Sequence, residues 1–146
     1  MPLLEEALIY LVANTTNLKA PTSTGTKVPV YIGHLPPEVP DVALGMYAPG
    51  GAPPLAKLAG TVPFVERPRI QVISRAPTYV VAASNAQHVW DAFFKLANVN
   101  VAKSVGSTAV TFWASAEPVG SPADIGKDAL ERDQISVDFQ IVKEMS

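Results

Sequence analysis

Apolar residues recur at the spacing of an α-helix in two segments of the chain. The first covers residues 3–13, and its early acidic residues suit the positive end of a helix dipole. Its apolar face consists of Leu4, Ala7, Leu8 and Leu11. The second segment runs from Thr78, a residue type favoured as N-cap, to about Ala97. Its apolar stripe consists of Tyr79, Ala82, Ala83, Ala86, Trp90, Phe93 and Ala97, and its polar side carries Asn85, His88, Asp91 and Lys95. We therefore expect a short N-terminal helix and one long helix.

Alternation of polar and apolar residues predicts strands elsewhere. It is clearest over residues 134–142, where the inward positions are Ile135, Val137, Phe139 and Ile141. Residues 69–74 alternate in the same way, with Ile70 and Val72 on one side. β-branched and other apolar residues predict further strands over residues 28–35, 42–47, 99–105 and 109–115. Pro29 restricts the first of these to a sheet edge or a strand start.

Three segments lack any periodicity and are expected to be loops, namely residues 14–27, 48–65 and 117–133. The middle one is apolar but rich in proline and glycine, which excludes a helix or a central strand. Long loops of this kind are uncommon in a compact domain and are usually functional or covered by a partner. The last one is polar and is interrupted by Pro118, Gly120, Pro122 and Gly126. We therefore expect residues 48–65 and 117–133 to carry contacts with other proteins.

The predicted elements follow the order α-β-β-β-α-β-β-β along 146 residues. Strands in series after a helix are typical of a mostly antiparallel sheet, so the expected class is α+β, with the sheet packed against the long helix. The length fits a single domain over residues 1–146.

Charged residues are few and unevenly distributed. They make up 16% of the chain, against roughly 25% in a typical globular protein. This low fraction favours a surface that is partly covered by partners over a slightly apolar monomer. Residues 61–103 hold five basic and two acidic side chains, whereas residues 104–146 hold three basic and seven acidic ones. The two regions could meet head to tail between identical subunits, or be separate solvated faces of a monomer. The net charge of −2 gives no argument for binding nucleic acid.

The sequence offers little for catalysis or metal binding. His34 and His88 are far apart, and neither has a partner at the spacing of metal ligands. His88 and Asp91 lie three residues apart on the long helix, but a solvated pair on a helix face explains them better than a catalytic pair. The acidic residues of the 117–133 segment lack the spacing of a calcium loop. We expect no enzymatic activity, no cofactor and no metal.

Other classes are also disfavoured. The chain has no cysteine, which excludes disulfides and thiolate metal sites. No apolar run reaches the roughly 20 residues of a membrane span. The N-terminal segment carries Glu5 and Glu6 and no basic region, so a signal peptide is not expected. We therefore expect a soluble protein of a cytosol-like environment that does not bind membranes.

Several stretches, taken in order, resemble a group of tailed-bacteriophage proteins. They are residues 46–54 (Met-Tyr-Ala-Pro-Gly-Gly-Ala-Pro-Pro), residues 66–72 (Glu-Arg-Pro-Arg-Ile-Gln-Val), and an alanine-rich helix from Tyr79 that ends in residues 89–93 (Val-Trp-Asp-Ala-Phe). The N-terminal helix and the closing strand over residues 135–141 fit the same group, so the resemblance spans nearly the whole chain. The group comprises the tail terminator or minor capsid proteins, also called tail completion or head–tail joining proteins.

The resemblance implies a structural virion protein that forms a ring, commonly hexameric, at the head-proximal end of a phage tail. Such a ring caps the tail tube and presents a surface to the neck. The implied partners are other copies of the chain, the major tail tube protein and the head–tail connector proteins. The implied location is the tail or neck of the virion, after assembly in the host cytoplasm.

Two alternatives remain beside this reading. One is a different structural subunit of the same kind of particle, such as a tail tube, minor capsid or decoration protein. The other is a small ligand-binding or enzymatic domain that uses His88 and Asp91. For the favoured reading, the expected interface residues are Pro49, Gly50, Gly51, Pro53, Pro54, Arg67, Arg69, Asp124, Lys127, Asp128 and Arg132.

Overall fold

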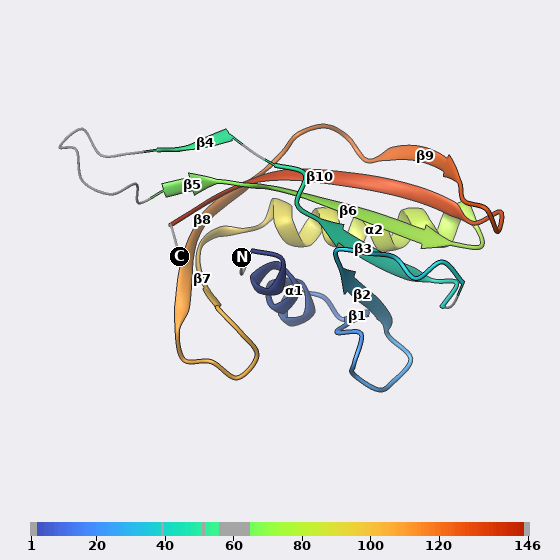
Figure 1. The fold of residues 1–146 in the computed structure, drawn as a ribbon, viewed down its shortest axis with the longest axis horizontal. Helices are drawn as coiled ribbons and strands as arrows, with labels where there is room; N and C mark the ends of the chain where they lie inside the picture. Colours follow the sequence, from blue (N-terminus) through green and yellow to red (C-terminus); the bar gives the residue numbers. More distant parts are fainter. Residues whose placement is uncertain (1–2, 39, 51, 56–64, 145–146) are drawn as a thin grey trace.

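The computed structural model describes residues 3–38, 40–50, 52–55 and 65–144. Within these residues the chain forms two helices and ten strands, and β10 runs through the middle of the sheet (Figure 1). The elements are α1 (Leu3–Asn14), β1 (Leu18–Lys19), β2 (Val28–Ile32), β3 (Ala43–Tyr47), β4 (Ala52–Leu55), β5 (Val65–Arg67), β6 (Arg69–Ala76), α2 (Tyr79–Phe94), β7 (Ala97–Ala102), β8 (Val110–Pro118), β9 (Ala123–Lys127) and β10 (Asp133–Glu144).

Strand β10 organises the sheet because it pairs with four other strands. Its first half lies between β6 and β9, and its last residues lie between β5 and β8. The sheet continues from β6 through β3 and β2 to β1, from β5 to β4, and from β8 to β7. Antiparallel pairing predominates, but β1, β2 and β3 run parallel to one another. The architecture is α+β, and its sheet is mixed.

Both helices cover the same core. Helix α2 packs against β6 and β10, where the rings of Phe93 and Phe139 lie 5.3 Å apart. Helix α1 lies across the end of this layer, and its Tyr10 ring stacks on Phe93 at 5.7 Å. The hydroxyl of Tyr10 donates a hydrogen bond to the carbonyl of Ala92. The inward alternation predicted for β10 is confirmed, since its four apolar positions are at most 3% exposed.

Helix α2 differs from its prediction in length and in two side chains. Thr78 is its N-cap as expected, but the helix ends at Phe94, because Ala97 already pairs with Ser115 in the sheet. With 16 residues against 12 in α1, it is not a single dominant long helix. Tyr79, predicted to lie on the apolar stripe, is 53% exposed because it begins the first turn. Asn85, predicted to lie on the polar side, is buried, and its side chain accepts a hydrogen bond from Asn17.

The three expected loops contain strands. Residues 18–19 form β1, where Leu18 is fully buried beside β2. In the 117–133 segment, β8 extends to Pro118 and β9 pairs with β10. Every side chain of β9 is exposed, so no apolar alternation marks it in the sequence. The 48–65 segment contains β4, which pairs with β5 at the sheet edge. Residues 51 and 56–64 of this segment lie outside the described part of the chain.

Two buried arginines hold the connection between the parallel strands β2 and β3. Arg75 donates hydrogen bonds to the carbonyls of Pro36 and Pro40. Arg132 donates to the carbonyls of Pro37 and Glu38. Parallel neighbours need a longer connection than a hairpin, and the carbonyls of this connection need donors. The two guanidinium groups supply these donors.

Candidate functional site

The expected interface residues lie near opposite ends of β10. The 48–65 segment reaches the sheet through β5, which pairs with Lys143 and Glu144. The 117–133 segment contributes β9, which pairs with residues 133–136 at the other end of β10. The two segments singled out from the sequence therefore belong to different ends of the molecule (Figure 1).

The proline- and glycine-rich residues are described only in part. Pro49 and Gly50 are exposed after β3, and Gly50 adopts a φ of 98°, which favours glycine. Gly51 lies outside the described residues. Pro53 and Pro54 belong to β4, and only their backbone is described. Proline removes backbone donors, so it blunts the free edge of β4 against strand addition.

The basic middle and the acidic end of the sequence meet within one chain. Arg69 on β6 donates to Asp138 on β10 at 3.4 Å, and both side chains are partly exposed. Arg67 is half-buried on β5. Lys143 lies 3.2 Å from Glu66 on the neighbouring strand. The Arg69–Asp138 pair joins the basic middle to the acidic end within one chain, whereas the Lys143–Glu66 pair joins a base of the acidic end to an acid of the basic middle.

The polar residues of β9 and the following turn fall into an exposed and a buried group. Asp124 accepts the backbone N–H of Gly126, and Lys127 lies 3.3 Å from Asp133. Arg132 is only 3% exposed and lies 2.8 Å from Asp128. Its guanidinium group is directed into the β2–β3 connection, so Arg132 stabilises the fold and does not belong to the free surface.

Asp128 has a perturbed pKa. Burial alone would raise the pKa of this carboxyl, but hydrogen bonds from the backbone and side chain of Arg132 and from the backbone of Leu130 outweigh it. The net result is a pKa below the usual value of 3.8. Burial, together with the neighbouring charge of Arg132, lowers the pKa of Arg75 in turn.

Exposed hydrophobic side chains gather at the two ends of α2 and β10. Among the described residues, eleven large hydrophobic side chains are exposed. Five surround the start of α2 and the β9–β10 turn, a surface that we call the β9 end: Tyr79, Val80, Val81, Ile125 and Leu130. Four others lie on the last turn of α2 and along the β7–β8 hairpin, which together we call the β8 end: Phe94, Val105, Val110 and Phe112.

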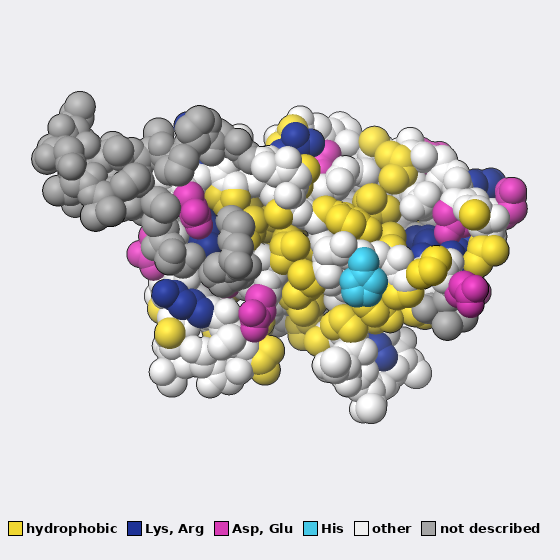
Figure 2. All heavy atoms as spheres, in the orientation of Figure 1, with side chains coloured by type: hydrophobic (Ala, Val, Ile, Leu, Met, Phe, Trp, Pro, Cys, Tyr) yellow, Lys and Arg dark blue, Asp and Glu magenta, His cyan; other side chains and the backbone are white. Residues whose placement is uncertain are grey.

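The topology places these two surfaces far apart. Helix α2 follows β6 directly and runs back along β10, so its first turn lies near Asp133 and its last turn near Phe139. Sixteen helical residues span about 24 Å. Figure 2 shows charged side chains of both signs at the end that holds β9, whereas the middle of this face is mostly apolar and uncharged.

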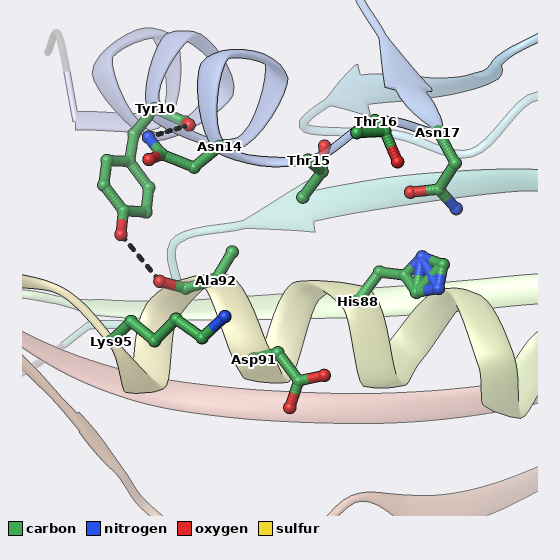
Figure 3. A pocket seen from close by; sticks show the side chains of 9 residues that line it. All are labelled: Tyr10, Asn14, Thr15, Thr16, Asn17, His88, Asp91, Ala92 and Lys95. Carbon is green, nitrogen blue, oxygen red and sulfur yellow. Dashed lines mark hydrogen bonds between the residues drawn. The ribbon is translucent and has the colours of Figure 1, made fainter.

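A hollow of about 360 Å³ lies between the end of α1 and the middle of α2 (Figure 3). Its lining includes Asn17, His88, Asp91 and Lys95. The His88 side chain points toward residues 16–17, whereas Asp91 points away from it. Asp91 instead accepts a hydrogen bond from Gln87 at 2.9 Å. The His–Asp pair considered from the sequence is therefore not assembled.

A buried ionic cluster escaped prediction from the sequence. The side chains of Lys143 and Glu6 are fully buried, and Lys143 lies 3.2 Å from Glu6. The indole N–H of Trp113 donates to the same Glu6 carboxylate at 2.9 Å. The sequence does contain an indication of this cluster, because Lys143 continues the alternation of inward-facing residues in β10. A charged residue at an inward position requires a buried partner.

Other site types find no support in the part of the chain that is described. No group of three His, Cys, Asp or Glu side chains within it is placed to hold a metal ion. No helix among the described residues is long and apolar enough to cross a membrane.

Comparison with known proteins gives little further information. No protein-family model matches the chain. No curated protein matches it. Among solved structures, the chain is similar to one whose description reads "Virion of native gene transfer agent (GTA) particle". The two share 15% sequence identity over 80% of this chain and 78% of that one, with a TM-score of 0.48. Similarity at this level supports no functional conclusion.

Proposed function

We propose that this protein is a structural subunit of a tailed-phage-like particle that works by assembling with other proteins, without catalysis. The observation that carries the proposal is the position of the exposed hydrophobic side chains. Nine of the eleven found among the described residues lie at the β8 and β9 ends. Exposed apolar groups concentrated on limited surfaces mark contacts with other proteins.

Within this class, we propose the role of a tail terminator: a ring of subunits, with six as the expected number, that caps the tail tube and meets the head connector. The sequence resemblance over residues 46–54, 66–72 and 79–93 supports this finer assignment. A ring subunit needs two different contact surfaces on one chain, and the β8 and β9 ends are two such surfaces. The expected interface residues Pro49, Gly50 and Lys127 adjoin elements at these ends.

A ligand-binding role is less well supported. The hollow beside His88 is open, and Asp91 is engaged by Gln87. A His88→Ala variant is therefore expected to complete tails as well as the wild type does.

The function is tested by tail-length control. Tail tube protein is polymerised with and without this protein, and tube lengths are measured by electron microscopy. The proposal predicts that addition stops elongation and leaves a cap at one tube end. Tubes that grow to the same length in both samples would contradict the terminator role. Co-polymerisation of this protein along the tube would favour a tube subunit instead.

A further inference from the structure

We propose that Glu66 is a releasable latch, through which the edge hairpin of β4 and β5 opens at its base while the buried core stays closed. We call β4 and β5 together the β4–β5 arm (residues 52–55 and 65–67). The inference goes beyond the proposed function, because it concerns a motion of the single chain and requires no partner. Three observations carry it: the pairing of the arm, the burial of its side chains and the charges around Lys143.

The arm joins the body through a short ladder. Strand β5 pairs with β10 at Lys143 and Glu144, and β4 pairs with β5. Both strands lie beyond the last turn of α2 (Figure 1). Where β5 meets β6, the carbonyl of Pro68 accepts a hydrogen bond from the backbone N–H of Ile141 at 2.8 Å, but proline has no N–H with which to return one. The ladder is therefore weakened at the base of the arm.

The side chains of β5 are also less buried than those of the strand that it continues. All three residues of β5 are half-buried, whereas Ile70 and Val72 on the adjoining β6 are at most 1% exposed. A two-stranded hairpin alone is at most marginally stable in water. The arm therefore depends on its anchor to β10, to which Glu66 contributes its carboxylate.

Lys143 holds two carboxylates at this anchor. Its ammonium group lies 3.2 Å from Glu6 and 3.2 Å from Glu66. The side chains of Lys143 and Glu6 have no exposed area, whereas that of Glu66 is 17% exposed. Two carboxylates and one ammonium group leave one negative charge unbalanced, and the carboxylates repel each other across the shared cation.

The three members of this cluster are therefore not equivalent. If Glu66 moves into water, Lys143 keeps Glu6 as its partner, and the pair that stays buried is neutral. If Glu6 moved instead, a fully buried group would have to leave the core, at a much larger cost. Trp113 also holds Glu6 in place, because its indole N–H donates to the Glu6 oxygen that Lys143 approaches. Glu66 is thus the member that releases, and the arm opens with it.

The test is hydrogen exchange, followed by NMR on the full chain, in a Glu66→Gln variant. This substitution keeps the shape of the side chain and removes its charge. We expect the backbone amides of β5 to exchange at least tenfold faster than in the wild type, because local opening no longer breaks an ion pair. The indole N–H of Trp113 and the amides of α1 should exchange at the wild-type rate, since Lys143 retains Glu6.

Asp138→Asn is the matched control. It removes the pair with Arg69 on the β6–β10 ladder, where the Asp138 side chain is 24% exposed, and it should leave exchange in β5 unchanged. A further variant combines Glu66→Gln with Val65→Cys and Glu144→Cys, two positions that face each other across β5 and β10. Its disulfide should hold the base of the arm closed and restore slow exchange, and reduction should make exchange fast again.

The inference is overturned if the amides of β5 exchange in Glu66→Gln as in the wild type, or if this variant fails to fold. It is equally overturned if Trp113 and α1 exchange faster to the same extent as β5, because the cluster would then open as one unit. Neither result bears on the proposed function, which the measurement of tube lengths tests separately.

Discussion

Lys143 joins the C-terminal strand β10 to the N-terminal helix α1 and to β5. Its ammonium group lies 3.2 Å from Glu6 on α1 and 3.2 Å from Glu66 on β5, and its side chain has no exposed area. Removing one partner of a buried ion pair leaves an uncompensated charge in a medium of low polarity. Glu6 and Glu66 therefore both depend on Lys143, because removing the lysine leaves a buried carboxylate without its partner.

We expect Lys143→Ala to lower the free energy of unfolding by about 3–5 kcal/mol, because Glu6 remains buried without its cation. Lys127→Ala removes a lysine whose side chain is 51% exposed and which pairs with Asp133, and it should cost at most about 1 kcal/mol. Both are measured by denaturant unfolding. Adding Glu6→Gln to Lys143→Ala should recover part of the loss. Equal effects of the two lysine substitutions would show that the cluster contributes no more than a surface pair.

Asp128 should make stability depend on pH at the acidic end of the scale. Its pKa in the folded protein is below the usual 3.8, so its contribution is present above that pH and is lost as the pH falls through the folded value. The difference in unfolding free energy between the wild type and Asp128→Asn should be constant from about pH 7 to about pH 5 and should shrink below pH 3.8. A difference that stays constant down to about pH 2 would contradict this assignment. Asp91→Asn, on the exposed face of α2, serves as the control.

At the scale of elements, the close approach of β3 to the chain that follows β2 depends on a missing side chain. A Cβ atom at Gly45 would lie 2.8 Å from Cγ of Leu35 and 3.1 Å from the carbonyl oxygen of His34. The backbone carbonyl cannot move without disturbing the β2–β3 connection, which Arg75 and Arg132 hold.

Gly45→Ala is therefore expected to destabilise the fold by about 1–3 kcal/mol through overpacking. Gly120→Ala is a matched control, because nothing lies within 4 Å of the position that its Cβ would take. Thermal and denaturant unfolding of the two variants measure the difference. If Gly45→Ala were as stable as Gly120→Ala, the inference that β3 packs tightly against the β2–β3 connection at Gly45 would be contradicted.

The elements that the sequence predicted well are those whose side chains alternate between core and solvent. Helix α2 with its Thr78 N-cap, β6, and the inward positions of β10 are of this kind. Strand β9 was missed because all its side chains are exposed, so only backbone pairing with β10 defines it. Strand β1 was missed because it is two residues long.

The candidate site, like the fold, could be predicted only in part from the sequence. Segments 48–65 and 117–133 were predicted to be contact loops, but they contain β4 and β9, and the role of single residues depended on tertiary contacts. Arg132 looked like a surface cation, yet it binds carbonyls of the residue 36–41 connection, which is distant in sequence. The exposed apolar ends were not predicted, since Tyr79 fits a core stripe equally well until the sheet edge is known.

At the scale of the whole molecule, the two ends should be dispensable for folding and necessary for assembly. Val80→Ser combined with Val105→Ser is expected to change the unfolding free energy by at most about 0.5 kcal/mol, because both side chains are largely exposed. The same variant should assemble more weakly than the wild type. Val119→Ser is the control, because Val119 is 49% exposed but lies beside the middle of β10. Loss of assembly in the control as well would show that the ends have no special part.

The central claim, that this chain works by assembling, is tested most directly by its mass in solution, measured by light scattering alone and after mixing with purified tail tubes. The account predicts a closed ring, or a monomer that joins tube ends and stops their elongation. A stable monomer that ignores the tubes would contradict it and would return attention to the hollow beside His88.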